Sequence, residues 1–423
     1  MLLQFTVENF LSFRDETRLS MKAPPGVTEQ TIEVPGHPGL RVMRITALYG
    51  ANASGKSNLV GAIQVATDLI AGAPRLPHGP FLLDEDAAAR PSRFQFDFIL
   101  EGRLYTYGFE VDTSQIVSEW LFEGEELIFS REAGDSEPRI ELGDRLRQGD
   151  GDYQQRIRFV AEGVPNRRLL LLEMAERHVH EVQPLQAWLS KGVVTVAPET
   201  RYRGLYRNLA LNPELRRFYS ESLRAMDTGI LEVRVVSSEQ RPESRPEGAV
   251  EPSEENGKRV WRMLEFFHEG NVGQPLLEEN ESDGTRRLLH LLPLLYARPQ
   301  VSLDTFVIDE LDRSLHTSLT RRFIQDFLDQ DRRGPGNQLL FTTHDTNLLN
   351  GRLLVPAAIW FVEKDRTGAS HLHSLAEYDS GQLTRLTERL EEGYLQGRFG
   401  AIPFLAPRDL AWAPAHHEEG KTP

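Results

Sequence analysis

The stretch that decides the fold is Gly50-Ala51-Asn52-Ala53-Ser54-Gly55-Lys56-Ser57, which matches the pattern G-x-x-x-x-G-K-[ST]. The short apolar run 45–49 before it predicts a strand, and the apolar residues of 59–70 recur after it at helical spacing. A strand, a glycine-rich loop and a helix are the context in which this pattern binds nucleotide phosphates. The sequence therefore predicts a P-loop in an α/β fold.

Each residue type in this loop suits a task at a phosphate chain. The glycines let the loop curl so that backbone N–H groups face the β-phosphate. Lys56 would bridge the outer phosphates, and the Ser57 hydroxyl would reach Mg²⁺. ATP and Mg²⁺ are the expected cofactors, since the chain has no Asn-Lys-x-Asp motif to read guanine. The expected nucleotide contacts in the loop are Gly50, Ala51, Asn52, Ala53, Ser54, Gly55, Lys56, Ser57 and Asn58.

A pair of acids follows a second predicted strand. The run 303–308 is mostly apolar and ends in Asp309-Glu310. Asp309 would hold Mg²⁺ through water, and Glu310 would polarise the attacking water. The alternative is a strand that simply ends in solvated acids. About 250 residues separate Lys56 from Asp309, far more than compact P-loop kinases and small GTPases need.

A polar turn, Glu279-Asn280-Glu281-Ser282-Asp283-Gly284-Thr285, directly precedes an apolar helix. Ser282 suits the N-cap, and Gly284 permits close backbone approach. A helix that begins with Ser, Gly and Thr presents free N–H groups to an anion. Alone this is an ordinary helix start, but its place 27 residues before Asp309 favours nucleotide contacts by Ser282, Gly284 and Thr285.

A third strand is predicted at residues 338–343 and ends at His344. A helix expected at about 315–330 separates it from the strand that ends in Asp309-Glu310. The two strand ends should then be neighbours in a parallel sheet. There His344 would sense the γ-phosphate, although a histidine at a strand end is more often only a satisfied polar residue.

The remaining chain is organised around these motifs. The alternation of Leu3, Phe5 and Val7 predicts a strand, and residues 93–130 predict an antiparallel meander. The expected divisions are an N-terminal ATPase lobe at 1–166, a helical insert at 167–238, a polar flexible linker at 239–258, a C-terminal ATPase lobe at 259–405 and a tail at 406–423.

Composition excludes several classes of protein. The chain has 423 residues, no cysteine, and a formal net charge of −15 at pH 7. It therefore has no disulfide framework and no cysteine-ligated zinc or iron–sulfur site. Its apolar runs are shorter than the roughly 18 residues of a membrane span, so we expect a cytoplasmic protein without a membrane partner. The acidic balance argues against a broad grip on nucleic acid and leaves room for a local basic surface.

Taken in order, these motifs resemble those of ABC-class ATPases of the RecF/SMC-like branch. GANASGKS resembles Walker A, ESDGT the signature loop, TFVIDE Walker B, DRSLH the D-loop and FTTHD the switch histidine. PSRFQFDF, GRLYTYGFEV, FVEKD and EEGYLQGRFGAIPFL resemble segments of the AAA-labelled ATPases of bacterial phage-defence operons, of the RloA-like and abortive-infection type. The resemblance covers most of residues 1–405.

The resemblance implies an ATPase with two lobes, one with a mixed or antiparallel sheet and one with a parallel sheet, joined by a helical insert. It implies a head-to-tail homodimer, or a higher even oligomer, in which Ser282 and Gly284 contact the γ-phosphate bound to the other protomer. Lys56, Glu310 and His344 would be catalytic, and Ser57 and Asp309 would be the metal ligands.

The resemblance also implies an anti-phage defence ATPase that senses a trigger and controls a separate effector, a nuclease or toxin. Fewer than 80 residues follow His344, too few for the Toprim nuclease domain of related proteins. A DNA-repair or DNA-metabolism ATPase that clamps nucleic acid is the alternative. A transporter subunit fits least, because the signature reads SDGT and the chain is too long.

Three further sequence patterns can be explained either by a binding function or by a purely structural role. Arginines and tyrosines alternate over 201–224, which suits a nucleic acid or acidic partner as well as a solvated helix face. The histidine pairs His178/His180 and His371/His373 lack carboxylate or cysteine companions for a metal site. The glutamine loop of the ABC engine has three poor candidates, Gln95, Gln115 and Gln183.

Overall fold

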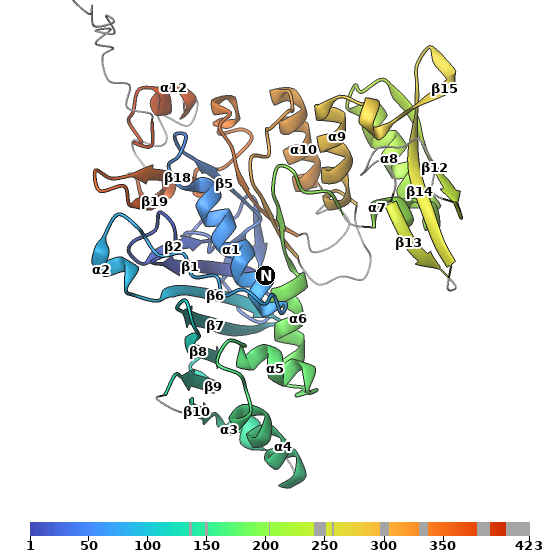
Figure 1. The fold of residues 1–423 in the computed structure, drawn as a ribbon. Helices are drawn as coiled ribbons and strands as arrows, with labels where there is room; N and C mark the ends of the chain where they lie inside the picture. The colour runs from blue at the N-terminus through green and yellow to red at the C-terminus, as the bar shows by residue number, and fades with distance from the viewer. Residues whose placement is uncertain are drawn as a thin grey trace, which may run out of the picture.

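A six-stranded sheet drawn from distant parts of the chain carries the predicted nucleotide loop (Figure 1). Its order is β11-β16-β17-β5-β18-β19, and each neighbouring pair is parallel except β18 and β19. The carboxyl ends of five neighbouring strands, β11 to β18, therefore meet at one edge. The strands are β5 (Ile45–Tyr49), β11 (Val193–Val196), β16 (Thr305–Ile308), β17 (Gln338–Thr342), β18 (Ile359–Lys364) and β19 (Ser370–Ser374).

These elements belong to a computed structural model. It describes residues 1–134, 138–148, 151–202, 204–240, 251–255, 258–296, 304–329, 337–378 and 390–402.

A second sheet has seven strands, all paired antiparallel, in the order β10-β9-β8-β7-β6-β1-β2. It contains the predicted meander and the predicted opening strand. The strands are β1 (Leu2–Glu8), β2 (Thr17–Ser20), β6 (Ser92–Leu100), β7 (Arg103–Val111), β8 (Ile116–Glu123), β9 (Glu126–Glu132) and β10 (Arg139–Leu142). A short ribbon of β3 (Thr31–Glu33) and β4 (Arg41–Met43) lies beside it.

Helix α1 (Lys56–Ile70) packs between these two sheets. Its buried residues Leu59 and Ile63 share one hydrophobic cluster with Phe5 and Phe96 of the seven-stranded sheet. Leu340 of β17 joins the same cluster from the other sheet. The helix that follows the loop is thus fixed on both sides. Further helices on this side are α2 (Glu85–Ala88), α3 (Asp144–Arg147), α4 (Gly151–Glu162), α5 (Leu170–Glu176) and α6 (Gln183–Lys191).

The opposite face of the six-stranded sheet builds a second core. Successive residues of a strand point to opposite faces, and Phe341 faces this core whereas Leu340 faces α1. Figure 1 shows α9 and α10 between the six-stranded sheet and a four-stranded sheet. The helices are α7 (Leu205–Leu211), α8 (Pro213–Ala225), α9 (Asp283–Leu291), α10 (Thr317–Asp329) and α12 (Leu390–Leu395).

The four-stranded sheet pairs β14 with each of its three neighbours, all antiparallel. Its strands are β12 (Ile230–Ser238), β13 (Glu251–Glu255), β14 (Lys258–His268) and β15 (Asn271–Leu277). Short 3₁₀ turns connect the elements elsewhere: η1 (Glu278–Asn280), η2 (Leu292–Leu294), η4 (Thr346–Leu348), η5 (Pro356–Ala358) and η6 (Leu375–Glu377).

Two sequence expectations differ from this architecture. The segment expected as a helical insert, 167–238, also contains β11, which pairs with β16 in the six-stranded sheet. Its four residues are Val-Val-Thr-Val, whose β-branched side chains favour a strand. Part of the expected linker, Glu251–Glu255, is strand β13, because its backbone pairs with β14 despite few apolar side chains. Residues 241–250, 256–257 and the tail 406–423 lie outside the described residues.

None of the described helices is both long and apolar enough to cross a membrane.

Candidate nucleotide site

The predicted P-loop lies between the end of β5 and the start of α1, as its sequence indicates. Two glycines allow close contact with the β18–β19 hairpin. A Cβ atom on Gly50 would lie 2.3 Å from the carbonyl oxygen of Val362. Gly55 has φ +117°, and a Cβ there would lie 2.3 Å from the Ser370 hydroxyl oxygen. No larger residue fits either place, so the glycines set the shape of the loop.

Lys56 holds the start of this loop. Its ammonium donates to the carbonyl oxygens of Gly50 and Ala51, at 2.7 and 3.0 Å. The side chain is only 4% exposed. Burial lowers its pKa to about 8, although the nearby carboxylates of Asp309 and Glu310 act to raise it. A phosphate bound here would supply a negative charge next to the ammonium, and this would favour the protonated form of Lys56.

The acid pair is ordered by the neighbouring strand. Thr342, at the end of β17, donates its hydroxyl to Asp309 Oδ1 at 2.6 Å. The same hydroxyl oxygen accepts the backbone N–H of Glu310 at 2.7 Å. Glu310 has φ +48°, a left-handed conformation that costs a non-glycine residue about 1 kcal/mol or more. Sequence reasoning gave Thr342 no role, although it stands two residues before His344.

Glu310 and His344 meet at the carboxyl edge of the parallel sheet, as predicted. His344 Nε2 lies 3.8 Å from Glu310 Oε1, and both side chains are about one-third exposed, at 38% and 31%. They line a cavity of about 430 Å³ together with Asn52, Ala53, Ser54, Gly55, Lys56, Ser57, Asn58 and Lys364. The structure therefore brings the P-loop, the second acid and the histidine around one space.

The predicted signature loop lies elsewhere. Ser282 caps α9, since its hydroxyl accepts the backbone N–H of Thr285 at 3.1 Å. A Cβ on Gly284 would lie 2.8 Å from the carbonyl oxygen of Ser314, in the predicted D-loop, which explains the glycine. Among the described residues, the ones that line the cavity do not include Ser282, Gly284 or Thr285. Within one chain the predicted site is thus divided between two surfaces.

A buried arginine connects the two surfaces. Arg287, five residues after Ser282 on α9, is 6% exposed. Its guanidinium donates to the carbonyl oxygens of Asp309 at 3.1 Å and Glu310 at 3.3 Å, and also to those of residues 197 and 198. Burial lowers its pKa, and the nearby charge of Arg313 lowers it further. Sequence reasoning missed Arg287 because its partners are backbone atoms from distant segments.

The back of the P-loop is held by two serines. Asn58 donates to the Ser12 hydroxyl at 2.7 Å. The Ser370 hydroxyl donates to the carbonyl oxygen of Ser54 at 2.6 Å and lies 2.8 Å from the Ser12 hydroxyl. Ser12 belongs to the turn after β1, so the opening strand supports the loop directly. The alternation of Leu3, Phe5 and Val7 predicts this strand, but it does not show which atoms the turn after it contacts.

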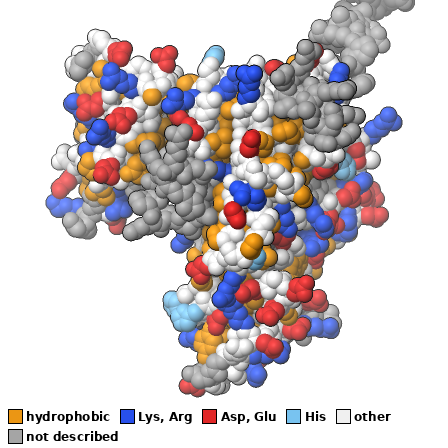
Figure 2. All heavy atoms as spheres, turned by 180° about the vertical axis from the view of Figure 1, so that it is seen from behind, with side chains coloured by type: hydrophobic (Ala, Val, Ile, Leu, Met, Phe, Trp, Pro, Cys, Tyr) orange, Lys and Arg blue, Asp and Glu red, His pale blue; other side chains and the backbone are white. Residues whose placement is uncertain are grey.

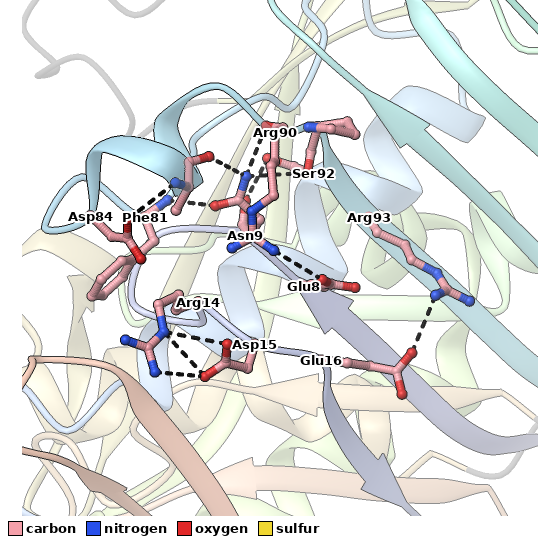
Figure 3. Close-up of polar contacts among 12 residues, drawn as sticks. Glu8, Asn9, Arg14, Asp15, Glu16, Phe81, Asp84, Arg90, Ser92 and Arg93 are labelled. Atoms are coloured by element: carbon pink, nitrogen blue, oxygen red, sulfur yellow. Dashed lines mark hydrogen bonds and ion pairs between the residues drawn. The ribbon is translucent and has the colours of Figure 1, made fainter.

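Asn9, in the same turn, fixes the segment that follows α1 (Figure 3). It is 1% exposed and has φ +49°. Its amide donates to the carbonyl oxygens of Ala87 and Arg90, both at 2.8 Å, and its side-chain oxygen accepts the N–H of Phe81 at 3.0 Å. The Ser92 hydroxyl donates to its backbone carbonyl at 2.7 Å. One asparagine thus ties β1 to the chain before β6.

The other singled-out patterns fall outside the cavity. Gln95 donates to Asp97, Gln183 donates to the carbonyl oxygen of Ala175, and Gln115 lies directly before β8. His371 pairs with Asp365 at 3.0 Å, and among the described residues no three metal-binding side chains gather as a metal site would require. Neither the glutamine loop nor a histidine metal pair is therefore identified.

The tyrosines of 201–224 face inward. Tyr206 and Tyr219 are buried, and their hydroxyls donate to Glu278 and to the carbonyl oxygen of Leu289. Arg217 is exposed and pairs with Glu221. On the face shown in Figure 2, basic and acidic side chains are interspersed over the described part. Core packing therefore accounts for Tyr206 and Tyr219 in this pattern.

The residues of the site fit a magnesium nucleotide. Ser57 brings a hydroxyl to the cavity, and the nearby Asp309 brings a carboxylate whose Oδ1 is already oriented by Thr342. Oxygen ligands of this kind are what Mg²⁺ prefers, usually with several waters retained. The cavity walls also hold one buried ammonium, that of Lys56, for the phosphates.

Comparison with known proteins yields one family. A family model described as "AAA domain, putative AbiEii toxin, Type IV TA system" matches residues 45–350. No curated protein matches the chain.

Three of the solved structures that match are SMC head domains. One, bound to the C-winged helix domain of ScpA, has a TM-score of 0.44 and 16% identity, covering 91% of this chain and 99% of its own. The head domain from Thermotoga maritima has a TM-score of 0.38 and 15% identity, covering 88% and 98%. A head with an extended coiled coil, bound to the C-terminal domain of ScpA and derived from Pyrococcus furiosus, has a TM-score of 0.45 and 15% identity, covering 91% and 98%.

Proposed function

The chain belongs to the family of AAA domains described as putative AbiEii toxin, type IV toxin–antitoxin system, and we propose that it binds ATP with Mg²⁺ and hydrolyses it to ADP and phosphate. One observation carries this proposal. Lys56, Glu310 and His344, contributed by three separate segments, line one cavity with the P-loop. A phosphate-binding loop, a general base and a γ-phosphate contact are the parts that phosphoryl transfer to water requires.

The roles follow from the positions of the atoms. Lys56 binds the outer phosphates, and the α1 N-terminus presents its N–H groups to them. Ser57 and Asp309 hold Mg²⁺, which neutralises charge on the phosphate oxygens when bound. Glu310 accepts the proton of the attacking water, and His344, 3.8 Å away, orients the terminal phosphate. Thr342 keeps both acids in place, so most of the catalysis is positioning.

The divided site supports a dimer. Ser282 is exposed at the start of α9 and does not line the cavity of its own chain. If these two surfaces stay apart, Ser282 can contact only a nucleotide that is bound to another chain. We therefore propose a head-to-tail homodimer, or a higher even oligomer, in which Ser282, Gly284 and Thr285 contact the phosphates bound to the partner. In this view residues 1–166 and 259–405 supply two ATPase lobes, and the segment 167–258 that joins them adds strand β11 to the six-stranded sheet.

We further propose that turnover controls a separate effector protein in anti-phage defence in the cytoplasm. The support is the family description, which refers to a toxin and a toxin–antitoxin system. Direct clamping of nucleic acid is the less favoured candidate. The buried tyrosines of 201–224 are not available to stack on bases, and the charges in Figure 2 form a mixed surface.

Phosphate release by the purified chain tests the core of this proposal. Glu310→Gln fills the same space but accepts no proton, so it should retain ATP and lose turnover. Glu125→Gln, in an exposed turn that does not line the cavity, removes the same charge and should leave turnover unchanged. Wild-type rates from Glu310→Gln would remove Glu310 from the role of general base. Stimulation of hydrolysis by DNA would favour the nucleic-acid candidate over the effector.

A further inference from the structure

Lys364 lies on the wall of the nucleotide cavity that the sequence motifs do not cover. It is the last residue of β18, which pairs in parallel with β5 on the side away from β17. His344 follows β17, and Lys364 ends β18, so the two flank the loop that follows β5. Both line the same cavity as Lys56 and Glu310.

The approach of β18 to the loop locates Lys364 more closely. A Cβ on Gly50 would lie 2.3 Å from the carbonyl oxygen of Val362, so β18 touches the first residue of the loop. The ammonium of Lys56 is bonded to the carbonyl oxygens of that same first residue and of Ala51. Lys364 lies two residues beyond Val362. It therefore brings a second cation close to the first residues of the loop, where the ammonium of Lys56 is positioned to bind the outer phosphates.

No described residue neutralises the charge of Lys364. Its side chain is exposed, and no hydrogen bond or ion pair joins the ammonium to a described residue, although the backbone of Lys364 pairs with Ser370 of β19. Its neighbours in sequence are acids with other partners. Glu363 accepts the backbone N–H of Ala401 at 3.1 Å. Asp365 accepts from the hydroxyl of Thr367 at 2.6 Å and pairs with His371 at 3.0 Å.

An ammonium that no described residue neutralises, on the wall of a cavity beside the P-loop, fits an anionic group of the ligand. Resting on the nucleotide function proposed above, we propose that Lys364 binds the terminal phosphate of ATP from the side of the loop opposite His344. ADP lacks that phosphate. Lys364 is then a specificity-determining residue that makes the site prefer ATP over ADP, whereas Lys56 serves both nucleotides.

Calorimetric titration of Lys364→Ala with ADP and with a non-hydrolysable ATP analogue tests this. Affinity for the ATP analogue should fall roughly tenfold, the size expected for a charge-assisted contact in a partly exposed site. Affinity for ADP should change by less than about twofold, because no contact to ADP is lost. Lys364→Arg keeps the charge and should retain most of the preference.

A matched control separates a direct contact from a general change of charge. Arg366 is exposed in the same hairpin and is not among the described residues that line the cavity. Arg366→Ala should leave both affinities unchanged. Equal losses for ATP and ADP with Lys364→Ala, no loss for either, or the same effect from Arg366→Ala would each overturn the proposal.

Lys56→Ala distinguishes this failure from that of the nucleotide function. If Lys56→Ala loses both nucleotides while Lys364→Ala loses neither, the ATP site stands and only the role of Lys364 is wrong. If Lys56→Ala binds both nucleotides normally, the nucleotide site itself is wrong, and Lys364 has no role in it.

Discussion

The hydroxyl of Thr342 donates to the carboxylate of Asp309 at 2.6 Å, across two neighbouring parallel strands. This contact joins the strand that ends at His344 to the strand that carries the acid pair. It is buried on both sides, because each of the two residues is 9% exposed or less. The position of Asp309 therefore depends on one hydroxyl as well as on its own backbone.

Thr342→Val should keep the shape of this side chain and remove the hydrogen bonds to Asp309 and Glu310. A buried carboxylate that loses its donor costs the folded state about 1–3 kcal/mol. Turnover should fall roughly tenfold or more, since both acids lose their orientation. Urea unfolding and phosphate release measure the two effects, and Thr342→Ser is the control that should restore both. A valine variant with normal turnover would show that the hydroxyl does not position the acids.

Proton uptake on ATP binding should reveal the state of Lys56. Burial lowers the pKa of its ammonium to about 8, so the charged form dominates near neutral pH and is lost as pH rises through that value. Bound phosphate favours the charged form, so binding at about pH 8.5 should take up a proton, and affinity should fall by up to about tenfold per pH unit above it.

Calorimetry in two buffers with different heats of ionisation measures this uptake directly. Lys56→Arg is the control, because a guanidinium stays protonated over this range. If wild-type protein takes up no proton at about pH 8.5, its ammonium is already charged there or lies away from the phosphates.

Mixing two inactive variants tests whether the sites are shared between chains. Ser282→Arg should block hydrolysis while a single chain still binds ATP, and Lys56→Ala should lose ATP binding. A mixed dimer has one site with both defects and one with neither, so random exchange should restore about a quarter of the activity. Proven exchange of subunits without any recovered phosphate release would rule out composite sites.

Arg287→Met should disturb both surfaces of the chain. The substitution leaves the carbonyl oxygens of Asp309 and Glu310 without their donor, and the free energy of unfolding should fall by about 2–3 kcal/mol. Turnover should fall while nucleotide binding to the loop remains. Arg286→Met, next to it, removes a guanidinium with one exposed acid partner, Asp283, and should change stability by less than about 0.5 kcal/mol. Equal effects from the two substitutions would remove the special role of Arg287.

The sequence predicts those features of the site that depend on neighbouring residues. The P-loop, the helix N-cap at Ser282 and the strand that ends at Asp309 are patterns over a few positions, and the structure has them where expected. The approach of His344 to Glu310 was also predictable, because one helix between two parallel strands makes them neighbours.

Features that depend on distant segments were not predictable. Arg287 binds backbone carbonyls, which any sequence provides, so no pattern marks its partners. Val193–Val196 is too short to show the alternation of apolar and polar residues that marks a strand. Only its pairing with β16 makes it part of the central sheet. Asn9 adopts a positive φ and binds backbone atoms about 80 positions away, which its own neighbours do not indicate.

The order of strands in the central sheet has a consequence for synthesis on the ribosome. β5, which carries the P-loop, pairs with β17 and β18, both of which emerge about 290 residues later or more. At a translation rate of about 5–20 residues per second, β5 is synthesised roughly 15–60 s before β17, its first pairing partner. Gln338 of β17 also exchanges hydrogen bonds with Leu2 of β1, at 2.7 and 2.9 Å. The nascent chain therefore exposes an unpaired apolar strand for most of its translation, which makes it a natural client for chaperones.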